Sequence, residues 1–243
     1  MSGSQWQTEQ LSKTYLEGVR AAIPLAQTQL ELIIQLVRAW CPHPRGVIDL
    51  GCGDGILGGA ILENFPGSRV WFVDFSDTML AAAREKVATN DRATVIKADF
   101  SAPAWSKSFP ARQDINLVVS GFAIHHQPDR RKEALYTEIY ELLAPGGLFL
   151  NLEHVASATE EIQAVFDDFF IDHLYAHHCQ SDPDKPRAEI AETYYARPDK
   201  VENMLALVET QCVWLRQIGY KDVDCFFKIL ELALFGGRKP LHD

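Results

Sequence analysis

Short apolar runs alternate with amphipathic segments through the first two thirds of the chain. Strands are predicted at 47–50, 69–74, 93–99, 115–120 and 147–155. Helices are predicted between them, at about 56–64, 76–89 and 130–144. This alternation indicates a parallel sheet built by right-handed crossovers. Because ligands of such sheets bind at the carboxyl ends of the strands, the loops that follow these runs are the first candidates for a site.

We interpret residues 1–243 as a single domain, in which further segments precede and follow this alternating pattern. Helix-period apolar positions before the first strand predict two cap helices within 1–43, separated near Pro24. The alternating core occupies 44–156. The stretch 157–199 is rich in acids, histidines and aromatic residues and lacks strand patterns, so we interpret it as a helical lid inserted into the domain.

Residues 200–243 predict a closing helix, which ends at Gly219, and a last pair of strands. The expected fold class is therefore α/β. We expect a Rossmann-like, mostly parallel sheet of seven strands with helices on both faces, an antiparallel last strand and a helical lid.

Composition narrows the possible partners. The chain carries 23 Lys and Arg against 33 Asp and Glu, a net charge of -10, which disfavours nucleic acid. The basic triplet at 130–132 is interpreted as the solvated start of a helix. No apolar run approaches the roughly 18 residues of a membrane span, and the first ten residues do not resemble a signal peptide, so we expect a cytoplasmic protein without a membrane partner. The five cysteines are scattered without a C-x-x-C pair and indicate reduced thiols.

The glycine-rich stretch "VIDLGCGDGILGG" at 47–59 follows the first predicted strand and can be interpreted in two registers. Gly53, Gly55 and Gly58 spell the G-x-G-x-x-G of dinucleotide-binding enzymes. Gly51, Gly53 and Gly55 spell a tighter pattern that begins directly at the strand end. The tight turn is needed at that end, which favours the second register.

Acidic residues decide which ligand suits this loop. Asp49 lies in the strand and Asp54 in the loop, and no Lys or Arg occurs from 46 to 68. A phosphate-binding loop usually avoids nearby carboxylates. The stretch therefore favours a cationic, phosphate-free nucleoside, and Gly58 is predicted to be a helix-packing residue.

The same stretch, "VIDLGCGDG", resembles the first motif of the class I S-adenosylmethionine-dependent methyltransferases almost letter for letter, and further motifs recur in order across about 44–153. The closing "GGRK" and the strands before it resemble a bacterial small-molecule branch of that family. The resemblance implies S-adenosylmethionine as cofactor, a small-molecule acceptor, and methyl transfer to an O or N atom. Only the segment 157–199 falls outside it.

The resemblance also implies residue roles in cofactor binding. The methionine part would contact the first loop, with Asp49 acting on the ammonium and Gly55 letting the next helix pack closely; the loop residues involved are Gly51, Cys52 and Gly53. Asp74, which ends "VWFVD", would accept from both ribose hydroxyls.

Adenine would be flanked by Phe75 and Met79 and would bond to Asp99 and to the backbone of Phe100. In this family the loop after the fourth strand closes over the methyl donor, a role that falls to Ser120 and Phe122. Tyr15 and Arg20 in the cap helices would cover the cofactor, Arg20 by pairing with its carboxylate.

Histidines supply the candidate catalytic groups. His125 and His126 in "SGFAIHH" follow the fourth strand, where a neutral imidazole can serve as a general base. Methyl transfer from a sulfonium depends mainly on positioning, so a base is helpful but not obligatory, and paired histidines also occur as structural residues. His154, at the end of the fifth strand, is a further candidate for the substrate pocket.

The lid contains opposing signals about the acceptor. Tyr194, Tyr195 and Arg197 would suit a planar or carboxylate acceptor, whereas the lid acids would suit an amine or simply form a solvated face. His173 and His177 stand at i and i+4 and form a weak metal candidate, but the sequence offers no second ligand pair, so no metal is predicted.

Three alternatives to methylation of an acceptor remain open from the residues alone. The first is a related chemistry on the same fold, such as modification of the cofactor's own methyl group or metal-assisted transfer. The second is a non-catalytic cofactor-binding partner protein. The third is a dehydrogenase, which the acidic loop disfavours.

Overall fold

A computed structural model describes residues 23–103, 105–109, 115–197, 200 and 202–241. Its sheet has seven strands in the order β3-β2-β1-β4-β5-β7-β6. The strands are β1 (Gly46–Leu50), β2 (Arg69–Asp74), β3 (Ala93–Lys97), β4 (Ile115–Gly121), β5 (Leu148–His154), β6 (Lys221–Ile229) and β7 (Leu232–Arg238). Strands β1 to β5 pair in parallel, and β7 is antiparallel to both β5 and β6. The predicted α/β fold class is confirmed.

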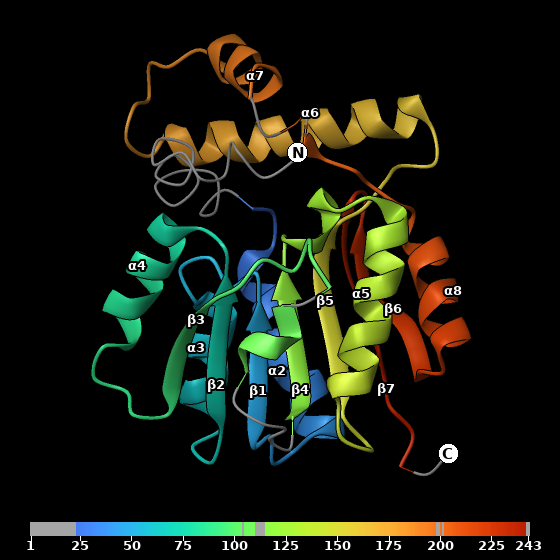
Figure 1. The fold of residues 1–243 in the computed structure, drawn as a ribbon. Helices are drawn as coiled ribbons and strands as arrows, with labels where there is room; N and C mark the ends of the chain where they lie inside the picture. Colours follow the sequence, from blue (N-terminus) through green and yellow to red (C-terminus); the bar gives the residue numbers. More distant parts are fainter. Residues whose placement is uncertain (1–22, 104, 110–114, 198–199, 201, 242–243) are drawn as a thin grey trace.

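Helices cover both faces of the sheet and its upper edge (Figure 1). They are α2 (Ala26–Trp40), α3 (Ile56–Asn64), α4 (Asp77–Val87), α5 (Asp129–Leu142), α6 (Glu160–His178), α7 (Arg187–Tyr195) and α8 (Val208–Ile218). In Figure 1, α5 lies in front of the sheet, α2 lies behind it, and α6 and α7 lie across the top. The described residues between 157 and 199 are helical without strands, as the sequence indicated.

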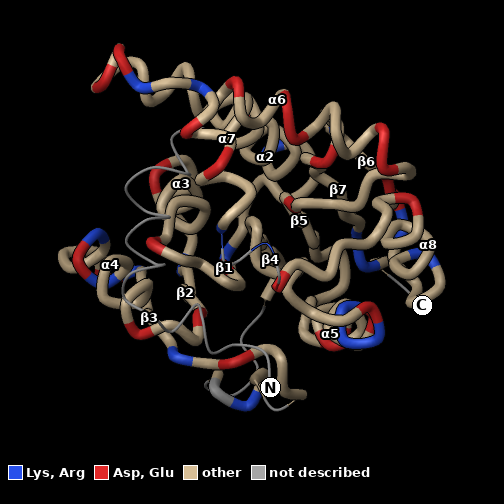
Figure 2. Tube along the Cα trace, turned by 90° about the horizontal axis from the view of Figure 1, so that it is seen from above, with Lys and Arg blue, Asp and Glu red and all other residues tan. Residues whose placement is uncertain are grey.

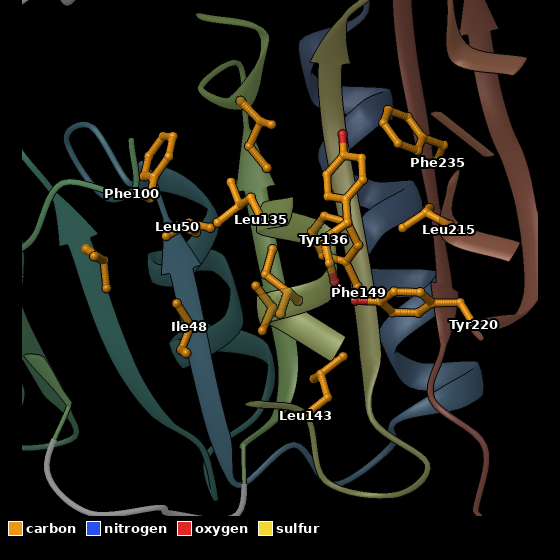
Figure 3. Close-up of a cluster of buried hydrophobic side chains, with 14 of the residues drawn as sticks. Ile48, Leu50, Phe100, Leu135, Tyr136, Leu143, Phe149, Leu215, Tyr220 and Phe235 are labelled. Atoms are coloured by element: carbon orange, nitrogen blue, oxygen red, sulfur yellow. Dashed lines mark hydrogen bonds between the residues drawn. The ribbon is translucent and has the colours of Figure 1, made fainter. Parts of the chain in front are cut away.

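Alternation along the strands divides the core between the two faces. Val47 packs with the apolar faces of α2, α3 and α4, while its neighbour Ile48 packs with those of α5 and α8, because successive side chains of a strand point to opposite faces. Figure 3 shows the second of these clusters, with Tyr136 of α5 beside Phe149 of β5. A smaller cluster joins α6 and α7 to the start of β7. The helices across the top are therefore packed against the sheet.

Local signals account for several element boundaries. Ser76 is the N-cap of α4, and its hydroxyl accepts from the Met79 N–H, as expected of a serine directly before a helix. Gly219 ends α8 in the left-handed conformation, with φ of 119°. Helix α2 begins shortly after Pro24. The helix predicted before that proline lies outside the described residues.

The predicted start of the closing helix is wrong. The closing helix was expected to start near 200, but α8 begins only at Val208. The preceding backbone is held by neighbours instead, because the Met204 N–H donates to the His125 carbonyl and the Ala206 carbonyl accepts from the Ala156 N–H. Such long-range bonds override a helix-period pattern.

The basic triplet at 130–132 does begin a helix, but two of its residues are not solvated. Lys132 is buried and donates to Asp129 and to the Met204 carbonyl. Arg131 makes a double contact with Glu138, with both N–O distances at 2.7 Å. These side chains are therefore part of the packing between α5 and its neighbours.

Arg92, which precedes β3, ties the end of α3 to the sheet. Its guanidinium donates to the carbonyls of Leu62, Phe65, Pro66 and Ser68 at 3.1 to 3.4 Å. We expect Arg92→Met to lower the free energy of unfolding by about 2 kcal/mol, because several helix-end carbonyls lose a charged donor. Urea unfolding measures this change. The exposed Arg84→Met variant is the control, and an equal loss in both variants would contradict the assignment.

Within the described part of the chain, no helix is both long and apolar enough to cross a membrane.

Candidate functional site

A cavity of about 480 Å³ opens at the carboxyl ends of β1, β2 and β4. Its volume is typical of small-molecule sites, and the position is the one expected for a parallel sheet. Residues from the loops after β1 to β4, from β5, from α2 and from the segment before α8 line it. The cavity therefore gathers groups that are distant in sequence, from Ile23 to Glu202.

The loop after β1 forms one wall of this cavity, and its backbone requires glycine. Gly51, Gly53 and Gly55 have φ of 67°, 54° and 84°, in the left-handed region. A Cβ on Gly51 would lie 2.3 Å from the Cβ of Ala123 in the loop after β4. The two loops thus approach each other more closely than any side chain at that position allows.

Gly58, within α3, has the packing role that its position predicted. A Cβ there would lie 2.4 Å from the Phe72 ring, and the Gly58 N–H donates to Asp49 Oδ2 at 2.8 Å. The helix therefore packs directly on β2 and fixes one oxygen of an acid that lines the cavity.

The second loop acid has a cationic partner that the local sequence does not reveal. Lys86 of α4 donates to Asp54 Oδ2. Asp49 and Asp54 both line the cavity, but Lys86 follows Asp54 by 32 positions in the sequence. The stretch that lacked Lys and Arg in sequence is therefore partly neutralised in the fold, so Asp54 contributes less negative potential than its position suggests.

Asp74, at the end of β2, is a buried carboxylate on the cavity wall. Its Oδ2 accepts from the Gly53 N–H and its Oδ1 from the Ser76 N–H, each at 2.9 Å. Burial raises the pKa of Asp74, and the backbone hydrogen bonds oppose that shift. The carboxylate thus links the glycine loop to the N-terminus of α4 while it faces the cavity.

Four residues predicted to surround adenine line the same cavity. Phe75 lies between β2 and α4, Met79 is in the first turn of α4, and Asp99 and Phe100 follow β3. Asp99 Oδ1 accepts from the Ser101 N–H at 2.8 Å. The set combines apolar faces with one carboxylate.

The loop after β4 contributes Phe122 but not Ser120. Phe122 lines the cavity in a left-handed backbone conformation, with φ of 52°. Ser120 is fully buried in the sheet, and its hydroxyl donates to the Leu50 carbonyl at 2.7 Å. Ser120 is therefore not among the residues that line the cavity, and its hydroxyl joins β1 to β4.

The two neighbouring histidines have different surroundings. His126 lines the cavity, whereas His125 is buried, with Nδ1 lying 2.6 Å from Glu153 Oε1. Their ring centroids are 3.9 Å apart. Of the predicted pair, His126 is therefore the one placed to meet a ligand, and His125 lies behind it.

None of the four predicted substrate residues is among those that line the cavity. His154 pairs with Glu231 at 2.7 Å and packs against Phe166 of α6. The Tyr194 side chain is buried, and its hydroxyl donates to Asp167 at 2.5 Å. Its polar end is therefore already hydrogen-bonded within the protein. Tyr195 is exposed, and Arg197 stacks 6.0 Å from the Tyr194 ring centroid.

Acids recur along α6, as Figure 2 shows from above. Among the residues described, no group of three or more His, Cys, Asp or Glu is arranged to hold a metal ion. His173 Nδ1 bonds to the Phe169 carbonyl, and the His177 ring contacts that of His178. Tyr15 and Arg20 lie outside the described residues.

Several wall residues were not predicted from the sequence. They come from α2 and its start, from the loop after β4 and from the segment before α8, and include Gln29, Leu30, Gln127 and Glu202. The amphipathic pattern of α2 indicated a packed helix but not which residues would reach a cavity. Only the docking of α2 beside α3 and β5 brings Leu30 to this wall.

Comparison with known proteins gives a family for this geometry. A family model described as "Methyltransferase domain" matches residues 47–147, which include the glycine loop and the ends of β2, β3 and β4. Residues 47–147 form a methyltransferase domain of the class I S-adenosylmethionine-dependent type. S-adenosylmethionine is accordingly the cofactor of this methyltransferase.

Individual relatives are distant. The methyltransferase is 26% identical over 220 residues to carboxy-S-adenosyl-L-methionine synthase of Shewanella amazonensis, covering 88% of this chain and 84% of that protein. It is 33% identical over 113 residues to trans-aconitate 2-methyltransferase of Variovorax paradoxus, covering 46% of this chain and 40% of that one. The second match thus spans less than half of the relative.

A solved structure supports the fold alone. An O-methyltransferase family protein from Burkholderia thailandensis matches with a TM-score of 0.68 and 17% identity, covering 99% of this chain and 63% of that one.

Proposed function

We propose that this methyltransferase transfers a methyl group from S-adenosylmethionine to an O or N atom of a small-molecule acceptor, with His126 accepting the proton. The observation that carries the proposal is that one cavity joins the glycine loop, Asp74 and His126. When bound, the cofactor supplies an electrophilic methyl group on a sulfonium. The chain's own residues bind and orient the cofactor and the acceptor, and they accept the proton that the acceptor loses.

The residues present fit this cofactor chemically. Of the described residues that line the cavity, none is Lys or Arg, and five are carboxylic acids: Asp49, Asp54, Asp74, Asp99 and Glu202. This donor set suits a ligand with an ammonium and a sulfonium and disfavours one with phosphates.

The position of each wall residue suggests which part of the cofactor it holds. We assign the ribose hydroxyls to Asp74, because a buried carboxylate can accept from two donors. Adenine is assigned to the wall formed by Phe75, Met79, Asp99 and Phe100, and the methionine part to Gly51, Cys52 and Gly53 with Asp49 beneath them. The acceptor then meets the wall formed by Phe122 and His126.

His126→Ala is expected to lower kcat by roughly a hundredfold or more, because general-base catalysis contributes that much when the base is positioned. Affinity for S-adenosylmethionine should stay within about twofold. The acceptor is first identified from its labelled product, by mass spectrometry after incubating the protein with labelled methyl donor and a metabolite extract, and kcat is then measured with the unmethylated acceptor as substrate. His43→Ala, a change at an exposed histidine, is the control. An unchanged kcat in His126→Ala would remove the proposed base.

Modification of the cofactor itself is the second candidate. The relative named carboxy-S-adenosyl-L-methionine synthase is matched over 84% of its length, against 40% for the trans-aconitate methyltransferase. The same mass spectrometry separates the two functions. Label in a new acceptor supports methyl transfer, whereas a cofactor of altered mass with no methylated acceptor supports the second candidate.

A further inference from the structure

The histidine behind His126 is hydrogen-bonded to a buried carboxyl group that the proposed function does not use. Glu153, near the end of β5, is 1% exposed, and its Oε1 lies 2.6 Å from His125 Nδ1. The same oxygen accepts from the His154 N–H at 3.1 Å. Because the His125 ring contacts that of His126, the carboxylate is one ring removed from the cavity wall.

The position of Glu153 is fixed by polar groups from three elements. Its Oε2 accepts from Asn151 Nδ2, which also lies 3.3 Å from the Tyr136 hydroxyl. Tyr136 of α5 donates to Gln211 of α8 at 2.6 Å. Figure 3 shows Tyr136 beside β5, within the apolar cluster of that face. A carboxylate held in this way has little freedom to follow a moving ring, so it restrains the ring that it bonds.

Glu153 also interacts with a protonated His126 through its charge. Burial raises the pKa of Glu153 to about 7, while His126, the His154 backbone, Lys132 and the His154 ring act in the opposite direction. The attraction is reciprocal: an ionised Glu153 favours the protonated form of His126. Titratable neighbours therefore face Glu153 from the loop after β4 (His125, His126), from β5 (His154) and from α5 (Lys132, Tyr136).

We propose that Glu153 is a positioning residue for the reaction, which holds the His125 ring through Nδ1 and stabilises the proton that His126 accepts. The carboxylate keeps a proton on His125 Nδ1, which sets the tautomer of that ring. Above about pH 7, where Glu153 is ionised, its negative charge behind His125 offsets the positive charge that His126 gains when it takes the acceptor's proton. Glu153 itself does not touch the ligand. This inference rests on the proposed role of His126.

The test follows the histidine rings by NMR in the full-length chain, so it needs no acceptor. In Glu153→Gln, the pH at which His126 takes up its proton should fall by about one unit, because the neighbouring charge is lost. Glu153→Asp keeps the charge and withdraws it by one methylene, so the His126 midpoint should stay closer to that of the unchanged chain. Binding of S-adenosylmethionine, measured by calorimetry, should be retained in both variants.

Glu231→Gln is the matched control. Glu231 is also buried, at 2% exposed, but its partner is His154, so this change should leave the His126 midpoint in place. An unmoved His126 midpoint in Glu153→Gln would overturn the inference, as would equal shifts in both Gln variants. The proposed function fails separately, through an unchanged kcat in His126→Ala.

Discussion

Asp74→Asn is expected to weaken binding of S-adenosylmethionine about a hundredfold. Each hydrogen bond to a charged group contributes about 1.5 to 3 kcal/mol, and 1.4 kcal/mol is a factor of ten, so a partial loss of two such bonds gives this magnitude. The amide also offers one acceptor oxygen where Gly53 and Ser76 each require one. Calorimetry should show the same loss for the demethylated product, because the ribose is common to both ligands.

Asp77→Asn is the control for this change. Asp77 lies three positions away and loses the same charge, but it is exposed and pairs with Lys97 on the surface. Its variant should bind both ligands as tightly as the unchanged chain, since a surface ion pair contributes little. Equal affinities in Asp74→Asn and Asp77→Asn would refute the assignment of the ribose to Asp74.

Gly58→Ala and Gly59→Ala are expected to change stability in opposite directions, although the two glycines are adjacent in α3. A Cβ on Gly58 would lie 2.4 Å from Phe72 and 3.0 Å from Asp49 Oδ2, and Phe72 is fully buried and cannot yield. Overpacking of this kind costs about 2 to 3 kcal/mol. A Cβ on Gly59 has nothing within 4 Å. Alanine there should stabilise the chain by about 0.5 to 1 kcal/mol through helix propensity.

Urea unfolding of the two variants measures both changes. Gly58→Ala should also weaken binding of S-adenosylmethionine, because the displaced helix carries the N–H that fixes Asp49. Gly59→Ala should leave binding unchanged. If both alanines stabilised the chain, the close approach of α3 to β2 would be disproved.

Much of the fold was readable because its signals are local. The predicted ranges 69–74 for a strand and 56–64 for a helix agree with β2 and α3. Apolar runs bounded by turn residues define such strands. Gly219 ends its helix through its own backbone conformation, which does not depend on contacts with distant segments. The segment before α8 was mispredicted because its backbone bonds to His125 and Ala156, which no window of the sequence contains.

The site residues also divide into those that local sequence signals could predict and those that depend on distant contacts. The glycine loop and Asp74 could be placed because one motif and one strand end fix them together. Tyr194 was proposed for the substrate, yet its hydroxyl bonds to Asp167, a partner 27 positions away. No local pattern in the sequence points to Lys86, although its ammonium pairs with Asp54 of the loop.

The sequence by itself determined the fold class, the resemblance to a methyltransferase family and the loop that lines the cavity, because periodicity, turn residues and a contiguous motif act over short separations. Only the tertiary structure decided which side chains share the cavity. The packing of helices across the sheet joins His126 to the glycine loop and places His125 between His126 and Glu153. Contacts between distant segments depend on how whole elements dock, and that docking is set by burial of apolar surface along each element, which no single motif encodes.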